Sequence, residues 1–575
     1  MEEGDDRAQE RVDLIVRNAK VTTLQDRGSA AADAVAVSGE RIAAVGGEAD
    51  VMRLAGASTT VVDAGGRRVI PGLNDSHLHA IRGGLMFNLE LRWDGVDSLA
   101  RGLEMIREQA ERTPEGQWVR VMGGWSPYQF SERRMPTIAE LNRAAPDVPV
   151  LVLFGYSQVL LNQAGTAALG LSPASEQPGG QYEYIEGGLT VSGNSAVYAT
   201  IGGLPVLTDI GDRLNSTQYF LRELNRFGLT STVDAGESAT AYPEDYQAVA
   251  ELAARPGFPL RDSNFLFAQK PGTELSFWNS QTAAGGRGLN HAVSRLNGYV
   301  LRGAGEVLAW SAHDYENFLA PRPELTEQAI AQTAEVARVV ASHQWPIRIH
   351  ATYDQTISVL LDVLEQVFTD TGYTSRWAID HAETITPRNI ARVKRMGGGI
   401  AIQNRLSFSG EYFLDRYGPE AAASAQPLRQ IVDAGVPVGA GTDATRPASY
   451  NPWVSLYWMV TGRTVGGTQV ASPATRLSRE EALRLYTNGS AWFSGEEDIK
   501  GRLTPGQYAD LAVLSADYMS VPDGQIPRIE SLLTVTGGDV VYAASPFEAL
   551  SPEPLLPASP AWSPVALFGG YQHGS

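Results

Sequence analysis

The chain has 575 residues and a formal net charge of −19 at pH 7, which argues against nucleic acid or an anionic membrane as a partner, because both bind basic surfaces. Cysteine is absent, so disulfides, thiolate nucleophiles and Cys-ligated zinc are excluded, and any metal must be held by nitrogen and oxygen. No apolar run approaches the ~18 residues of a membrane helix, and the acidic N-terminus has no signal-like apolar core. We therefore expect a cytoplasmic protein acting on a small molecule, without nucleic-acid or membrane partners; whether it forms a homo-oligomer stays open.

Short strand-like segments occur near both ends of the chain. Residues 12–70 alternate or run apolar between Gly-containing turns, and residues 508–514 and 532–544 show the same pattern. Neither end makes a sheet by itself, so we predict one small β-sandwich domain assembled from residues 1–68 and 501–550. The Pro-rich residues 551–575 are expected to form a loosely packed tail.

The middle of the chain, residues 69–500, alternates strand-like and helical segments. The strand-like segments are 69–79, 228–236, 259–267, 298–306, 345–351, 377–383, 398–405 and 436–444. Eight such units predict an α/β fold with a (β/α)8 TIM-like barrel, although a doubly wound open sheet shows the same alternation. The first gap is too long for one crossover, so residues of about 93–210 are predicted to form an insertion with a helix at 99–112 and strands at 117–122 and 148–154.

The strongest local signal is the His-x-His pair of His77 and His79. On a strand both rings point to one face, and the C-terminal ends of barrel strands form the active-site face. Of only 8 histidines, His350 and His381 also end strand-like segments, and Asp443 closes the last one. These nitrogen and oxygen donors favour one or two divalent metal ions, with zinc the best match and other divalent metals suited to the same donors.

The stretch VIPGLNDSHLHA resembles the P-G-x-x-D-x-H-x-H strand of the amidohydrolase superfamily of metal-dependent hydrolases. The preceding β segment, IDHAETITP and GTDA resemble its amidohydrolase family 3, which includes N-substituted formamide deformylase-like proteins. The likeness extends from about residue 12 to 545. It implies a composite β domain and a distorted barrel that performs hydrolysis at one or two divalent metals.

Two positions depart from the pattern that the resemblance implies. Many superfamily members bridge two metals with a carboxylated lysine or a glutamate at the fourth strand. Glu306 ends the fourth predicted strand and is our preferred bridge, while Lys270 ends the third and is the alternative, so the metal count stays open. Near Phe154, where relatives carry a Gly-His-Ser element, Tyr156 occupies the place expected for the histidine.

The expected reaction is hydrolysis of a non-peptide C–N bond, of amide, formamide or carbamate type, by metal-activated water. Asp443 and His381 are the candidate catalytic residues: Asp443 accepts the proton of the water and passes it to the leaving nitrogen, while the metal or an imidazole polarises the carbonyl. Tyr156, Trp125 and Trp345 are the candidate substrate-binding residues and favour an apolar or aromatic substrate. The alternatives are an esterase, a lyase or isomerase on the same barrel, and a catalytically inactive binding homologue.

Overall fold

The computed structural model describes residues 12–25, 31–176, 180–236, 240–268, 270–285, 298–314 and 318–573. Its largest sheet contains eight parallel strands in the order β20-β19-β18-β17-β16-β15-β14-β7. In chain order they are β7 (Leu73–Leu78), β14 (Leu229–Asp234), β15 (Arg261–Leu266), β16 (Tyr299–Ala304), β17 (Ile347–Ala351), β18 (Trp377–His381), β19 (Gly399–Gln403) and β20 (Val438–Gly441). Each strand lies within one of the eight predicted segments.

The first and last strands of this sheet meet. The Asp443 amide donates to the His77 carbonyl at 2.8 Å, and the His79 amide donates to the Ala444 carbonyl at 3.0 Å. The Asp75 carboxylate accepts hydrogen bonds on both sides of the junction, from the His77 amide at 2.9 Å and the hydroxyl of Thr442 at 2.7 Å. These bonds complete the ring, so the barrel is confirmed in place of an open sheet.

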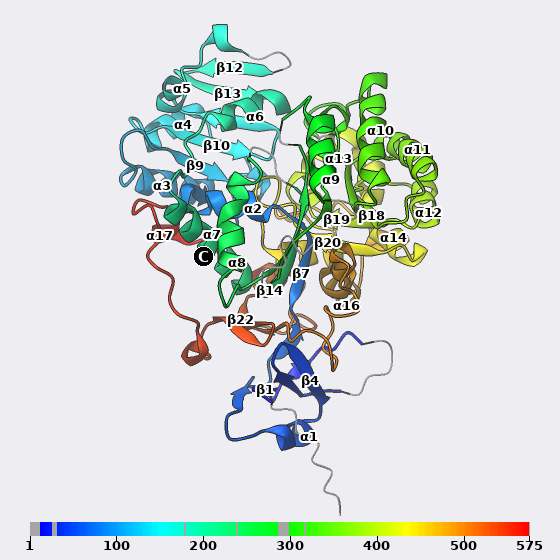
Figure 1. The fold of residues 1–575 in the computed structure, drawn as a ribbon. Coiled ribbons are helices and arrows are strands. Elements are labelled where there is room, and N and C mark those ends of the chain that lie inside the picture. Colours follow the sequence, from blue (N-terminus) through cyan, green and yellow to red (C-terminus); the bar gives the residue numbers. More distant parts are fainter. Residues whose placement is uncertain are drawn as a thin grey trace, which may run out of the picture.

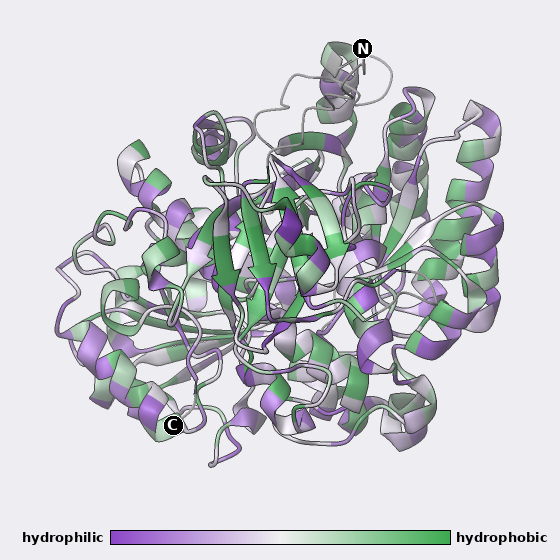
Figure 2. Ribbon diagram, turned by 90° about the horizontal axis from the view of Figure 1, so that it is seen from below, coloured by the Kyte–Doolittle hydropathy of each residue, from purple (hydrophilic) through white to green (hydrophobic). Residues whose placement is uncertain are grey.

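Helices surround the barrel (Figure 1), and many of their buried residues pack with the strands in one core. In α11, for example, Ile357, Leu361 and Leu364 recur at helical spacing and are buried, and the helix ends where Gly372 adopts φ of 61°. Figure 2 shows largely apolar strands near the centre of the view and mixed polarity along the surrounding helices. The helices are α2 (Ala80–Met86), α7 (Ile210–Arg226), α8 (Gln247–Ala253), α9 (Glu274–Gly285), α10 (Glu327–Ser342), α11 (Asp354–Thr371), α12 (Pro387–Arg395), α13 (Leu406–Ser424), α14 (Leu428–Ala434), α15 (Pro452–Thr461) and α16 (Arg479–Arg484).

A second sheet lies between β7 and β14 in the sequence and beside the barrel in space (Figure 1, upper left). Its strand order is β12-β13-β11-β10-β9-β8. The strands are β8 (Glu90–Arg92), β9 (Val119–Met122), β10 (Val150–Phe154), β11 (Gln158–Leu161), β12 (Gln181–Ile185) and β13 (Gly188–Ser192). The accompanying helices are α3 (Leu99–Ala110), α4 (Ile138–Ala144), α5 (Gln163–Ala168) and α6 (Asn194–Gly202). We call residues 90–202 the insertion; α3, β9 and β10 lie where the sequence predicts a helix and two strands.

Two further sheets lie below the barrel in Figure 1. Their orders are β4-β3-β1-β5 and β2-β6-β21-β22-β23. The strands are β1 (Leu14–Arg17), β2 (Lys20–Val21), β3 (Ala34–Ser38), β4 (Arg41–Gly46), β5 (Thr60–Asp63), β6 (Arg68–Pro71), β21 (Leu511–Leu514), β22 (Ser531–Thr536) and β23 (Asp539–Ala543). β21 pairs with β6, and Leu14 and Leu511 from different sheets share one apolar core. The small β region is therefore built from both ends of the chain, as predicted.

The tail is packed, which corrects the expectation of a loose extension. The Leu556 carbonyl accepts a hydrogen bond from the Tyr219 hydroxyl of α7 at 2.9 Å. The Gln572 amide donates to the Asp94 carbonyl at 2.8 Å, and Val565 on the short helix α17 (Val565–Phe568) is buried. A proline-rich segment cannot pair with itself, but α7 and the insertion supply partners for its backbone groups. None of the described helices is long and apolar enough to cross a membrane.

The insertion contacts the barrel most closely at the loop that follows β20. Gly124 of the insertion lies against Ala448 and Ser449 of this loop, and a Cβ on Gly124 would lie 1.7 Å from the Ser449 amide nitrogen. Both sides of the contact are backbone, so neither can move aside as a flexible side chain would. We call this contact the seam between insertion and barrel.

Replacing Gly124 with alanine is expected to destabilise the protein by about 1–3 kcal/mol, because the added methyl group pushes two backbones apart. The measurement is the midpoint of urea unfolding. Gly202→Ala is the matched control in the same insertion, since a Cβ there meets nothing within 4 Å. Equal midpoints for the two variants would contradict the close approach at the seam.

Candidate metal centre

The structure brings together all of the sequence-predicted metal ligands. Each one lies at or just beyond the C-terminal end of a barrel strand, the face on which barrel active sites form. Each is no more than 6% exposed, so the cluster is shielded from solvent. The residues are His77, His79, Glu306, His350, His381 and Asp443.

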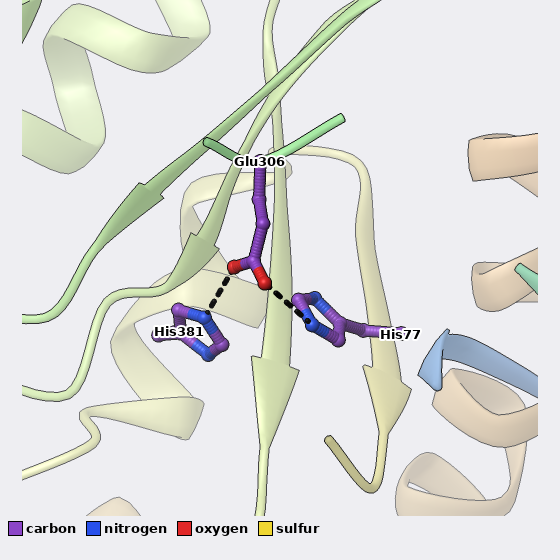
Figure 3. Close-up of side chains that lie close together, drawn as sticks. All are labelled: His77, Glu306 and His381. Atoms are coloured by element: carbon purple, nitrogen blue, oxygen red, sulfur yellow. Dashed lines mark hydrogen bonds and ion pairs between the residues drawn. The ribbon is translucent and has the colours of Figure 1, made fainter. Parts of the chain in front are cut away.

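The Glu306 carboxylate lies between His77 and His381 (Figure 3). Its Oε2 is 2.8 Å from His381 Nε2 and 3.0 Å from His350 Nδ1. Its Oε1 is 3.5 Å from His77 Nε2 and 3.8 Å from His79 Nε2. The two oxygens therefore face different pairs of histidines, which is the arrangement that a carboxylate bridging two cations requires.

Asp443 lies on the other side of the His-x-His pair. Its Oδ1 is 3.1 Å from His79 Nε2 and 3.6 Å from His77 Nε2. Its Oδ2 is 3.8 Å from His381 Nδ1 and 3.7 Å from Arg405 Nη1. Ligand atoms within 4.8 Å of one another form two triads that share one histidine: His77, Glu306 and His381, and His77, His79 and Asp443.

The donor atoms fit a bound cation. Among the described residues, His77 Nε2 and His381 Nδ1 are buried and have no hydrogen-bond partner. A buried polar nitrogen without a partner costs about 1–3 kcal/mol, and a divalent cation would engage its lone pair. A set of imidazoles and carboxylates without thiolates suits zinc and its divalent neighbours.

Opposite charges hold the cluster together in a water-poor space. Burial alone would lower the pKa of His77, but the carboxylates of Glu306 and Asp380 raise it to about 10. Burial would likewise raise the pKa of Glu306, yet His77 and the hydrogen bonds from His350 and His381 hold it well below its usual value. Burial and the positive charges of Arg405 and His350 lower the pKa of His381 well below its usual value, which leaves that imidazole neutral.

A buried ion pair orients His77. Its Nδ1 lies 2.9 Å from Asp380 Oδ1, and Arg348 Nε donates to Asp380 Oδ2 at 3.0 Å. Arg348 also donates to the Ser76 carbonyl at 3.0 Å. With Nδ1 engaged in this way, Nε2 of His77 points toward Glu306 and Asp443.

Asp380 and Arg348 are not among the residues predicted from the sequence. A signal for Arg348 exists, because it lies two residues before His350 on β17 and shares its face. Asp380 directly precedes His381, so simple alternation places the two on opposite faces. His381 has a φ of 80°, which ends the alternation and lets both side chains reach the centre.

His313 and Asp314 also belong to the site, although the sequence pattern places His313 in a loop and indicates no role for it. The rings of His313 and His350 are 3.8 Å apart, and Asp314 Oδ1 is 3.2 Å from His350 Nε2. Burial and the charge of His350 lower the pKa of His313 well below its usual value. No strand periodicity marks these residues; a His-Asp pair in a loop at the barrel mouth is the only available signal.

A small cavity of about 20 Å³ opens over the cluster. Of the three predicted aromatic residues, Tyr156 lines it and stacks on Tyr198 with ring centroids 4.9 Å apart. Phe267 and Trp310, which were not predicted, also line it. The remaining lining residues are His79, Arg82, Glu306, Val307, His313, His350, His381, Arg405 and Asp443.

The structure does not bring Trp125 and Trp345 to the cavity. Trp125 is 2% exposed in the core of the insertion, where its indole donates to the Leu153 carbonyl. Trp345 precedes β17, at the strand end away from the mouth, and packs edge-on against Trp278 in the helical layer. Lys270 is also unsuited to bridging, because it is exposed on a turn outside the cluster.

Comparisons with known proteins agree with this geometry. The amidohydrolase family model matches residues 60–542. The chain is 26% identical over 557 residues to an N-substituted formamide deformylase from Arthrobacter pascens, covering 92% of this chain and 98% of that protein. It is 23% identical over 509 residues to the putative amidohydrolase YtcJ from Bacillus subtilis (strain 168), covering 85% and 91%.

A solved structure shows the same fold. An uncharacterized metal-dependent hydrolase from Pyrococcus furiosus superposes with a TM-score of 0.61 at 22% identity, and the match covers 88% of this chain and 100% of that one. The family model spans most of the sequence, from the small β region through the barrel. The chain therefore belongs to the amidohydrolase family, as its His-x-His strand and the aspartate after β20 predict.

Proposed function

We propose that this protein hydrolyses a non-peptide C–N bond, of amide, formamide or carbamate type, in a small molecule. One observation carries the proposal: Glu306 and Asp443 each place a carboxylate oxygen within 4 Å of both His77 Nε2 and His79 Nε2 at the barrel mouth. The name of its Arthrobacter pascens relative, N-substituted formamide deformylase, supports a formamide or a related amide as the bond cleaved.

The ligand set suits zinc. His77, His79 and Asp443 would hold one cation, and Glu306 with His381 and His350 would hold a second or complete the first, because the two triads share His77. A bound divalent cation supplies Lewis acidity and lowers the pKa of water from about 15.7 to about 7.

Asp443 is the residue that moves protons in this proposal. Its Oδ1 and Oδ2 face His79 and His381, so the carboxylate borders the space where water and a carbonyl carbon would meet. It accepts the proton of the attacking water and delivers it to the leaving nitrogen. His381, whose Nδ1 lies 3.8 Å from Asp443 Oδ2, borders the same space and is the second candidate catalytic residue. The carbonyl oxygen would be polarised by the cation or by an imidazole that does not bind it.

Asp443→Asn is expected to lower kcat by about 10²- to 10⁴-fold, because an amide cannot take up the proton. Activity on an aryl formamide and metal content by elemental analysis are measured together, and metal is expected to remain bound through the histidines. Asp433→Asn, an exposed position on α14, is the matched control. A near-normal rate in Asp443→Asn would remove this residue from the mechanism.

Glu306→Gln is expected to lower the amount of metal bound per chain, because an amide has lost the negative charge that a bridging ligand supplies. The comparison is elemental analysis of wild type and variant after dialysis against the same zinc buffer. Wild-type stoichiometry decides between one and two ions. Unchanged metal content in Glu306→Gln would exclude the bridging assignment.

Matched formamide, amide, carbamate and ester substrates in water labelled with oxygen-18 test the reaction class. Hydrolysis is expected to place one labelled oxygen in the acid product, with C–N substrates turned over faster than esters. Preferred turnover of esters would favour the esterase alternative. Product without label would favour a lyase or isomerase instead.

A further inference from the structure

One loop of the barrel mouth holds His350 from both sides. The loop follows β16 and carries Glu306 at its start and Asp314 further along. Glu306 Oε2 lies 3.0 Å from His350 Nδ1, and Asp314 Oδ1 lies 3.2 Å from His350 Nε2. The His350 amide also donates to the Glu306 carbonyl at 2.9 Å. The imidazole of His350 therefore lies between two carboxylates, and its Nδ1 side faces the one that the other candidate histidines share.

Asp314 is fixed by the backbone that follows His350. Its Oδ1 accepts a hydrogen bond from the Thr352 amide at 2.9 Å, and its Oδ2 accepts one from the Tyr353 amide at 3.1 Å. The residue is 0% exposed. Amide hydrogen bonds to a buried carboxylate are charge-assisted, and a buried amide left without its acceptor is costly. The carboxylate is therefore held beside His350, at the point where the chain leaves β17.

Two more side chains restrain the ring of His350. The ring of His313 stands perpendicular to it, with the centroids 3.8 Å apart. The Thr352 hydroxyl lies 3.4 Å from His350 Nε2 and accepts a hydrogen bond from Arg405 Nη2 at 3.0 Å. Rotation of the imidazole would separate Nε2 from Asp314 and press the ring against His313. Packing and hydrogen bonding therefore favour the same orientation of His350.

The loop that carries the two carboxylates also forms part of the cavity wall. Val307, Trp310 and His313 lie between Glu306 and Asp314 in the sequence, and all three line the cavity. Both ends of this segment contact the imidazole of His350. The wall segment and the candidate ligand are thus fixed relative to each other.

We propose that Asp314 positions His350 for cation binding, by accepting the proton of Nε2 and leaving the lone pair of Nδ1 directed at the candidate metal centre. A carboxylate behind a histidine ligand fixes the tautomer of the ring and makes the ligand more basic. Asp314 does not line the cavity, so it acts through His350 and is a positioning residue. The inference rests on the metal centre of the proposed function, but not on which bond is cleaved.

Binding of Co²⁺ in place of zinc tests this role without requiring turnover. Each protein is equilibrated with buffers of fixed free Co²⁺, and the affinity and the visible spectrum of the bound ion, which reports its ligands, are measured. Asp314→Ala is expected to weaken Co²⁺ binding by about 10- to 100-fold and to change the spectrum. Asp314→Asn keeps an oxygen acceptor but loses the charge, so its affinity is expected to lie between the other two. Unchanged affinity and spectrum in Asp314→Ala would overturn the proposal.

Asp354→Ala is the matched control. Asp354 begins α11, and its Oδ1 accepts hydrogen bonds from the Thr386 amide and from Asn389 Nδ2, each at 2.8 Å. It therefore joins neighbouring segments at the barrel mouth as Asp314 does, but through residues that are not candidate ligands. This variant is expected to lower the midpoint of urea unfolding while leaving Co²⁺ affinity and spectrum unchanged. An equal loss of Co²⁺ binding in Asp354→Ala would reduce the effect of Asp314 to general stability and refute its positioning role.

A double-mutant cycle tests whether the effect passes through His350. In a His350→Ala protein, His77, His79 and Asp443 remain to bind an ion. Adding Asp314→Ala there is expected to change Co²⁺ affinity by less than about 2-fold, because no ring is left to position. A further loss as large as in the wild-type background would contradict the proposal. Should Asp314→Ala fail to fold, the cycle is run with Asp314→Asn, and no loss of affinity in that variant alone would contradict it equally.

The outcomes separate this role from the proposed function. If Co²⁺ binding depends on Asp314 through His350 but no formamide, amide or carbamate is hydrolysed, the proposed function fails and the positioning role stands. If these substrates are hydrolysed while Co²⁺ binding is independent of Asp314, the positioning role fails and the function stands.

Discussion

The hydrogen bonds that join the end of β7 to the residues just after β20 are the constraint on which both the barrel and the candidate metal centre depend. The bond from the Asp443 amide to the His77 carbonyl joins the first strand to the last, and both residues are ligand candidates. In an open sheet these strands would be opposite edges, and Asp443 could not lie 3.1 Å from His79. Asp75 secures the junction from within the core, where burial raises its pKa to about 7 while hydrogen bonds from both strands oppose that shift. Closing the ring and assembling the site are therefore one structural event.

Negatively and positively charged side chains alternate outward from Glu306. The carboxylate faces four imidazoles, and one of these is held from behind by Asp380, which Arg348 fixes in turn. Each charge in such a series offsets the desolvation cost of its neighbour, so removing one member leaves another buried and uncompensated. His381 and Asp443 also hold positive φ angles of 80° and 60°, uncommon for residues other than glycine. Strained backbone angles are common at functional residues, where the surrounding structure holds them in place. Here these angles direct the side chains of His381 and Asp443 toward the same part of the cluster.

The sequence predicts the parts of this arrangement that follow from strand periodicity. Histidines at strand ends lead to His77, His350 and His381, and Glu306 follows from its place after the fourth strand. Asp380 could not be predicted because the positive φ of His381 ends the regular alternation of side chains along β18. His313 could not be predicted because it lies in a loop at the barrel mouth, where side chains follow no regular spacing. Trp125 and Trp345 were predicted to bind substrate but lie in apolar cores. The sequence shows that a residue is aromatic, but packing between distant segments decides whether its side chain reaches the cavity. The packing of the tail escapes prediction for the same reason, since its partners lie hundreds of residues away along α7 and the insertion.

The candidate ligands and one wall of the pocket come from different parts of the chain. The barrel strands deliver every candidate ligand, whereas the insertion contributes Tyr156 and Tyr198 to the wall of the cavity. The two parts meet at the loop after β20, which begins beside Asp443 and also carries Arg446 and the backbone that Gly124 touches. The insertion also contacts α13, where Tyr412 packs against Tyr128 and Phe154 with ring centroids 5.4 Å apart in each pair. The positions of the candidate ligands are set by the ring of strands. The ring of strands thus fixes where the candidate ligands lie, and the insertion shapes one wall of the pocket above them, so the wall can vary while the ligands keep their places.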